Sequence, residues 1–215
     1  MGYTAELSAV GAEMPIRNWW YAELKGNQMS DAVLKALPSV RPMENTEVKA
    51  ASGKFEYPLM ETFPLTPRQA EEELAKAGRR VAELERMGDK VGKRTLDRAK
   101  VEVFLAGLRI DAAKTAANPN RPKTISLEQQ AIRIGDAVFV SFPCEVFSEI
   151  GLGVKKKSPF PKTFVCALAN EPDVGYLPTA EEFLEESYEV LSSPFSPKAG
   201  DVFIDTSLKL IEKVK

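Results

Sequence analysis

Histidine is absent from this 215-residue sequence, and cysteine occurs only twice. Without histidine, the chain itself cannot supply imidazole acid–base catalysis, a Ser-His-Asp triad, a Cys-His dyad or an imidazole metal ligand. No run approaches the roughly 20 apolar residues of a membrane span. The first 13 residues lack the regions of a signal peptide, and the compartment is left open. Lysine and arginine number 29 against 31 acidic residues, so no nucleic-acid partner is expected.

The composition is that of an ordinary globular protein, with 44% apolar and 28% charged residues. A chain of this length suits one large domain, and we predict a single domain over residues 1–215. Proline and glycine punctuate residues 1–65, which we interpret as an irregular lead-in. It contains one short helix at residues 31–37 and an extended segment at residues 47–57.

A helical hairpin is predicted at residues 66–117. Thr66 is a suitable N-cap, Pro67 suits the first helical position, and Gln69 completes a capping box. Apolar residues then recur at helical spacing up to Gly88, and a second helical run follows. We expect this hairpin to pack on a sheet, because its second helix is too apolar for an isolated arm. The alternative is a projecting arm that binds a partner.

Residues 122–215 carry a sheet with short helices. The apolar residues alternate, then change parity near Gln130, which predicts a β-bulge. Gly135-Asp136 is a two-residue turn between two strands. Residues 163–169 are apolar throughout and predict a central, buried strand. The expected fold class is α/β, with α+β as the alternative: a mixed β-sheet flanked by helices, with a long helical hairpin.

An acidic residue follows the apolar run at residues 137–142, in the segment SFPCEVFSE. Glu145 lies where ligands gather in α/β sheets, beyond the carboxyl end of a strand. Taken alone, it is also typical of a helix start. Asn170 ends the next apolar run, Tyr176 follows after a short loop, and Tyr188 lies twelve residues further on.

In order and spacing, the segments SFPCEVFSEIGL, FVCALAN, GYLPTAEEF and SYEV resemble the neutral/alkaline (non-lysosomal) ceramidase family. The matching region is the C-terminal part of that family's catalytic domain, and the preceding ISLEQQAIRIGDAVFV is also similar. The resemblance is clear over residues 125–190 and weak from about residue 24 to the hairpin. It implies that residues 1–215 are the C-terminal half of a larger catalytic domain.

The resemblance implies a zinc-dependent amide hydrolase that cleaves ceramide into sphingosine and a fatty acid. Two His, one Glu and one Tyr hold the zinc in that family. The Glu matches Glu145 and the Tyr matches Tyr176, so these two are the candidate metal ligands. A second Tyr, which hydrogen-bonds the oxyanion, matches Tyr188. The implied substrate is an N-acyl lipid or another amide, and family members are often exported or membrane-associated.

Two departures from the family pattern bear on activity. Cys144 stands where the family has glycine, which would perturb the turn if that glycine took a positive φ; a Cys144 thiolate would alternatively be a further zinc ligand. Both histidine ligands lie in a half that this sequence lacks. We therefore expect this chain alone to hold no zinc and to be inactive. The His-bearing half would lie in the same parent polypeptide or in a separate subunit.

A second function is a non-catalytic binding or oligomerisation module that kept the fold and lost the metal site. Half of an enzyme sheet would expose a strand edge and an apolar face, so a homo-oligomer is one expected outcome. A third, an enzyme with Cys144 as nucleophile, lacks a histidine base. We expect Cys144 and Cys166 to be free thiols in apolar surroundings rather than a disulfide.

Overall fold

The computed structural model describes residues 19–170 and 174–215. The contacts divide the chain into two compact units, residues 1–46 and residues 47–215. The expected single domain over residues 1–215 stays a prediction. Within the described residues, no helix is both long enough and apolar enough to cross a membrane.

The expected irregular lead-in over residues 1–65 is wrong in its described part. Helix α2 (Trp19–Ala36) replaces the short helix expected at residues 31–37, and strand β1 (Val48–Pro58) follows it. A single interior glycine, Gly26, costs a helix only about 1 kcal/mol relative to alanine, which is too little to end it. The extended segment expected at residues 47–57 is confirmed by β1.

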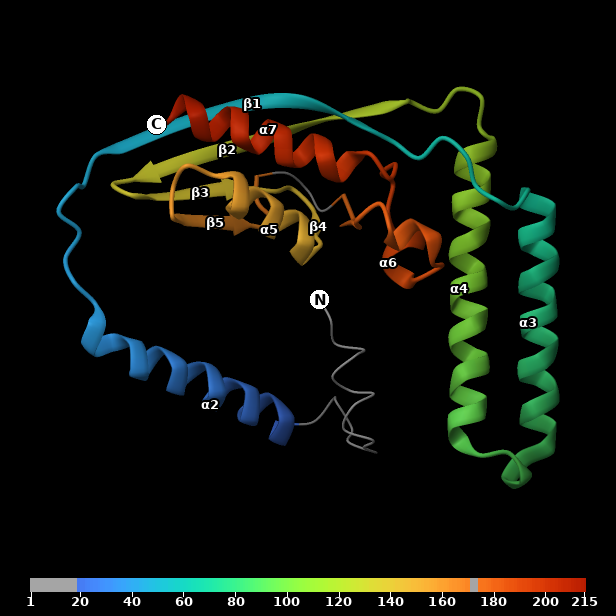
Figure 1. The fold of residues 1–215 in the computed structure, drawn as a ribbon. Coiled ribbons are helices and arrows are strands. Elements are labelled where there is room, and N and C mark those ends of the chain that lie inside the picture. The colour runs from blue at the N-terminus through green and yellow to red at the C-terminus, as the bar shows by residue number, and fades with distance from the viewer. Residues whose placement is uncertain (1–18, 171–173) are drawn as a thin grey trace. The chain divides into compact units, whose positions relative to one another are not determined.

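The second unit is built on a four-stranded mixed sheet in the order β1-β2-β3-β5 (Figure 1). Strand β2 (Thr124–Ile134) pairs antiparallel with β1 and with β3 (Ala137–Ser141). Strand β5 (Lys162–Cys166) runs parallel to β3. The expected α/β class, with a mixed sheet flanked by helices, is confirmed, and so is the two-residue turn between β2 and β3.

Two details of the sheet were predicted wrongly. The register of β1 and β2 runs without a break past Gln130, so there is no bulge; Ile132 and Ile134 simply lie on the outer face of β2. The apolar run at residues 163–169 is not a central strand, because β5 ends at Cys166 and lies at the edge of the sheet. Leu168 is already outside the strand, with a φ of 55°.

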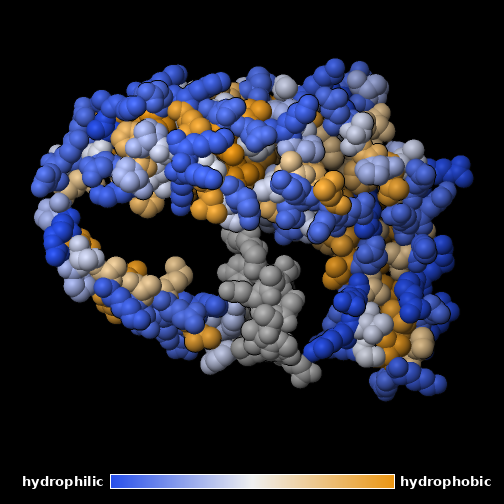
Figure 2. Space-filling model, in the orientation of Figure 1, coloured by the Kyte–Doolittle hydropathy of each residue, from blue (hydrophilic) through white to orange (hydrophobic). Residues whose placement is uncertain are grey.

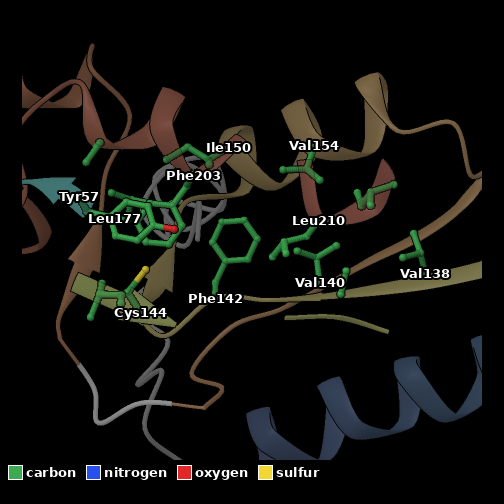
Figure 3. Close-up of a cluster of buried hydrophobic side chains, with 14 of the residues drawn as sticks. Tyr57, Val138, Val140, Phe142, Cys144, Ile150, Val154, Leu177, Phe203 and Leu210 are labelled. Carbon is green, nitrogen blue, oxygen red and sulfur yellow. The ribbon is translucent and has the colours of Figure 1, made fainter. Parts of the chain in front are cut away.

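Helices α5 (Ser148–Lys157) and α7 (Ala199–Lys213) cover one face of the sheet and enclose the core. Figure 3 shows Phe142 and Phe203 at its centre, with the side chains of α5, α7 and β3 around them. The ring of Phe203 stacks on Tyr57 with centroids 3.9 Å apart. Full burial of each side chain of this size stabilises the fold by about 1.5–3 kcal/mol.

A buried polar network lies within this apolar core. The Gln129 side-chain oxygen accepts hydrogen bonds from the hydroxyls of Tyr57 and Thr206, each at 2.5 Å. Its amide nitrogen donates to Ser207 Oγ at 3.1 Å and to the Ser141 carbonyl at 3.3 Å. Every polar atom of the buried amide therefore has a partner, as a stable core requires. Burial raises the pKa of Tyr57 above its ordinary value.

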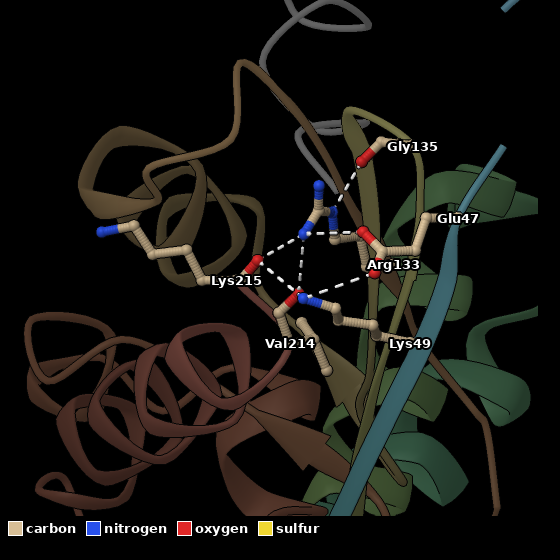
Figure 4. A network of polar contacts seen from close by, with 6 residues as sticks. All are labelled: Glu47, Lys49, Arg133, Gly135, Val214 and Lys215. Atoms are coloured by element: carbon tan, nitrogen blue, oxygen red, sulfur yellow. Dashed lines mark hydrogen bonds and ion pairs between the residues drawn. The ribbon is translucent and has the colours of Figure 1, made fainter. Parts of the chain in front are cut away.

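The end of α7 is held to the sheet through Arg133 of β2 (Figure 4). Its Nε donates to the Gly135 carbonyl at 2.7 Å, and its Nη1 donates to the backbone oxygens of Val214, at 3.2 Å, and Lys215. The Glu47 carboxylate lies 3.8 Å from the same nitrogen. One guanidinium thus joins β2 to the residue before β1 and to the chain end that follows α7, and this holds the end of the helix against the sheet.

The opposite face of the sheet carries an apolar row. The strand registers align Ala50, Ile132, Phe139 and Phe164 side by side across all four strands. The rings of Phe139 and Phe164 stack with centroids 4.9 Å apart. Ile132 is 40% exposed and Phe164 46% exposed. An exposed apolar sheet face, expected for half of an enzyme sheet, is therefore present.

The predicted helical hairpin is confirmed as α3 (Pro67–Met87) and α4 (Lys93–Ala117). Gln69 N donates to the Thr66 hydroxyl at 3.3 Å, and Thr66 N donates to the Gln69 side chain at 2.9 Å, which forms the expected capping box. At the other end of α3, Gly88 takes a φ of 55°.

The hairpin does not pack on the sheet as expected. Helix α4 instead contacts α6 (Tyr188–Leu191), and the two long helices project beside the sheet (Figure 1). Figure 2 shows hydrophilic residues along their outer sides and hydrophobic residues between them. The apolar side chains of α3 and α4 largely pack against one another, although Val101 and Phe104 of α4 stay more than half exposed. The geometry is that of the alternative, a projecting arm; a partner for it stays a prediction.

Candidate metal and tyrosine site

Two short parallel strands bring Glu145 and Tyr176 together. Strand β4 (Glu145–Val146) pairs with β6 (Tyr176–Leu177), and Glu145 lies opposite Tyr176 in the register. Glu145 N donates to the Gly175 carbonyl at 3.0 Å, and Phe147 N donates to the Leu177 carbonyl at 3.1 Å. Two residues 31 positions apart in the sequence thus become direct neighbours.

The alternation of strand side chains decides which face these two residues occupy. Cys144 and Leu177 are completely buried in the core, beside Phe142 (Figure 3). Because successive strand residues point to opposite faces, Glu145 and Tyr176 leave the strands on the side away from the core. Both side chains are only partly buried. The carboxylate and the phenol are therefore accessible, while their sequence neighbours hold the strands in place.

The surroundings of Tyr176 favour its neutral phenol. Partial burial, followed by the Glu145 carboxylate as an acceptor and as a negative charge, and then by Tyr188 and Glu189, raises the pKa of Tyr176 to about 12. A neutral phenol can donate a hydrogen bond to a carboxylate. A cation bound by Glu145 would compete for the same carboxylate oxygens.

Tyr188 is the first residue of α6, and its ring lies against Tyr176. Ser187 caps the helix, because its hydroxyl accepts a hydrogen bond from Val190 N at 3.3 Å. The rings of Tyr188 and Tyr176 meet edge to face, with centroids 5.7 Å apart. On its other side Tyr188 contacts Phe104 of α4, with centroids 5.8 Å apart. Tyr188 is 42% exposed. The structure thus brings Glu145, Tyr176 and Tyr188 into one cluster.

Sequence reasoning missed two residues that shape this cluster. Gly175 has a φ of 90°, and a Cβ built there would lie 2.6 Å from the Ser192 carbonyl oxygen. The sequence signal that could have indicated Gly175 is a glycine directly before a short strand. Phe104 supports the Tyr188 ring from a helix more than 80 residues earlier, and no local pattern indicates such a contact.

Cys144 acts as a core residue. It has no positive φ, since Leu168 and Asn170 are the non-glycine residues with that conformation in the described part of the chain. The expected perturbation of the turn therefore does not arise. Its thiol lies in the apolar core, on the face opposite Glu145, so the geometry supports neither a thiolate ligand nor a nucleophile. Cys144 and Cys166 do not form a disulfide, as predicted; Cys144 is buried, but Cys166 is exposed rather than enclosed.

The residues present do not make a complete zinc site. Structural zinc sites use four protein ligands and catalytic ones three, whereas Glu145 and Tyr176 supply two oxygen donors. Among residues 19–170 and 174–215, no group of three or more His, Cys, Asp or Glu is arranged to hold a metal.

Comparison with known proteins finds likenesses among solved structures alone. No protein-family model matches, and no curated protein matches. A neutral ceramidase from Pseudomonas aeruginosa is 18% identical, with a TM-score of 0.40, over 77% of this chain and 29% of that one. A ceramidase complexed with C2 is 23% identical, with a TM-score of 0.35, over 47% of this chain and 18% of that one. The chain thus spans less than a third of either protein.

Proposed function

We propose that this chain is one part of a ceramidase-like, zinc-dependent amide hydrolase, which in its complete form cleaves N-acylsphingosine or a related N-acyl amide. Glu145 and Tyr176 supply two of the metal ligands. The remaining ligands are histidines of a polypeptide region outside this sequence. The chain alone neither holds zinc nor hydrolyses amides.

The observation that carries the proposal is the pairing of Glu145 with Tyr176 across β4 and β6. The family resemblance named these two residues from motifs in different parts of the sequence. Their direct opposition in the register and their shared outward face place both side chains on one side of the two strands, and this supports the proposal.

Tyr188 has a different role in this proposal. Its ring lies beside Tyr176, and its partial exposure leaves the hydroxyl open to a substrate. A phenol donates a hydrogen bond to the oxygen of an amide as negative charge develops on it, which stabilises the transition state. Zinc, when bound by the complete protein, supplies the polarisation of the amide and the activation of water.

Cobalt(II) binding in the presence of imidazole tests the ligand role. Imidazole supplies the nitrogen donors that the chain lacks, and the visible absorption of Co²⁺ reports its coordination. We expect one Co²⁺ per chain with imidazole, and binding weakened at least about tenfold, or 1.4 kcal/mol, by Glu145→Gln or Tyr176→Phe. Tyr188→Phe and the neighbouring Glu149→Gln are controls that should bind as the unchanged chain does. Equal binding by all four variants, or no binding by the unchanged chain, contradicts the proposal.

A second candidate function is a non-catalytic oligomerisation module. The observation that favours it is the apolar row on the outer face of the sheet, in which Phe164 is nearly half exposed. Sedimentation equilibrium tests whether a second copy covers this face. Phe164→Asp should then dissociate the oligomer, while Leu184→Asp, at an exposed site on a different segment, should not. A monomeric unchanged chain contradicts self-association.

A further inference from the structure

Arg109 is the most enclosed cation described in the hairpin. It lies on α4 and is only 9% exposed. Its Nη1 donates to the Glu102 carboxylate at 2.7 Å, and its Nε donates to the Glu186 carboxylate at 2.9 Å. The Glu73 carboxylate of α3 lies 3.9 Å from Nη1. One guanidinium therefore joins both helices of the hairpin to a segment 77 residues away.

That segment leads directly into the candidate site. Glu186 precedes Ser187, which caps α6, and Tyr188 is the first residue of that helix. The same helix that carries Arg109 carries Phe104, whose ring contacts Tyr188. Helix α4 thus holds the start of α6 at two points, one charged and one aromatic, and Figure 1 shows the two elements side by side.

We infer that Arg109 is the positioning residue for Tyr188, and that the helical hairpin is the element that sets the Tyr188 ring against Tyr176. A catalytic role for the placed Tyr188 rests on the proposed function, but the placement of its ring against Tyr176 does not. Arg109 touches neither Glu145 nor Tyr176 in this arrangement; it acts through Glu186 and the cap of α6.

The chemistry of arginine suits this role. A guanidinium stays charged at any pH the protein tolerates, and its planar fork directs two donors to two carboxylates at once. One donor, Nη1, is used within α4, on Glu102. A different donor, Nε, is directed at Glu186. A lysine would provide the charge without this fixed direction.

Fluorine NMR of the chain labelled with 3-fluorotyrosine tests the inference. Resonances are assigned with Tyr→Phe variants. In Arg109→Gln and in Glu186→Gln we expect the Tyr188 resonance to move toward that of free fluorotyrosine, and the Tyr176 resonance to move with it as the edge-to-face contact is lost. The matched control is Glu102→Gln, because Glu102 has a similar side-chain exposure, 53% against 48% for Glu186. It should leave Tyr188 in place.

Tyr57, buried in the core, reports whether each variant is folded. If the Tyr57 resonance moves in Arg109→Gln, that variant is misfolded and does not test the inference. The surface variant Glu186→Gln then provides the test. A Tyr188 resonance unchanged in Glu186→Gln, or displaced as far in Glu102→Gln, overturns the inference. The measurement needs no metal, so it is separable from the proposed function. If the Tyr188 resonance moves in Glu186→Gln but the unchanged chain binds no Co²⁺, the positioning role stands and the proposed hydrolase is rejected. If the chain binds Co²⁺ but the Tyr188 resonance does not move, the metal site stands and the positioning role is rejected.

Discussion

Gly175→Ala is predicted to be strongly destabilising, because Gly175 meets two constraints at once. Its φ of 90° lies where residues with a Cβ are strained, which costs about 1–3 kcal/mol. The added Cβ would also lie 2.6 Å from the backbone oxygen of Ser192, which a side-chain rotation cannot relieve. Overpacking of this kind costs about 1–3 kcal/mol. The free energy of unfolding should therefore fall by about 2–6 kcal/mol.

Gly78→Ala is the matched control for this substitution. Gly78 lies within α3, and a Cβ there meets no atom within 4 Å. Alanine should raise the free energy of unfolding by about 0.5–1 kcal/mol, since it costs a helix less entropy than glycine. Urea denaturation followed by circular dichroism measures both variants. A Gly175→Ala protein as stable as the unchanged chain would refute the described conformation of the loop before β6.

Three further predictions follow from the same structure. In an alkaline titration of phenolate absorbance, Tyr176 should ionise near pH 12, after tyrosines with the ordinary pKa of about 10. A raised pKa favours the protonated phenol in the folded state, so its stabilising effect holds below pH 10 and is lost as the pH passes 12. Tyr176→Phe should remove the step near pH 12 and leave the later ionisation of the buried Tyr57; a titration unchanged by this substitution contradicts the raised pKa of Tyr176. A thiol reagent should label Cys166 in the folded chain and Cys144 only on unfolding, and rapid labelling of both contradicts the burial of Cys144. Gln129→Leu should lower the free energy of unfolding by about 1–3 kcal/mol, measured in urea, because the buried hydroxyls of Tyr57 and Thr206 lose the acceptor that they share; a neutral effect contradicts the described network.

Local sequence chemistry predicted the elements whose signals lie within a few residues. The capping box of Thr66 and Gln69 starts α3 as expected, since both partners belong to one turn. The turn at Gly135 and Asp136 likewise requires only its own backbone. These features depend on no distant part of the chain, so a single sequence is sufficient to place them.

Features that depend on distant partners were not predictable from pattern. The apolar run at residues 163–169 indicated burial, but apolar character does not distinguish an edge strand with an open apolar face from a central strand. The parity change near Gln130 has the same origin: Ile132 belongs to the apolar row of the outer face. The pairing of Arg109 with Glu186 spans 77 residues and leaves no local signal.

The candidate site was named from family motifs, and its geometry came from strand alternation. Glu145 and Tyr176 are accessible because Cys144 and Leu177 occupy the core side of the same strands. Cys144, at the position where the resembled family has glycine, packs as a small apolar residue, and its backbone has no positive φ.

The exposed apolar row and the Glu145–Tyr176 pair lie on different sheets. The row crosses β1, β2, β3 and β5, whereas Glu145 and Tyr176 belong to the two-stranded sheet of β4 and β6. A second copy of this chain would bury the row without adding a single imidazole, because the sequence has no histidine. Self-association without metal binding therefore favours the module, and metal binding by a monomer that requires added imidazole favours the hydrolase part.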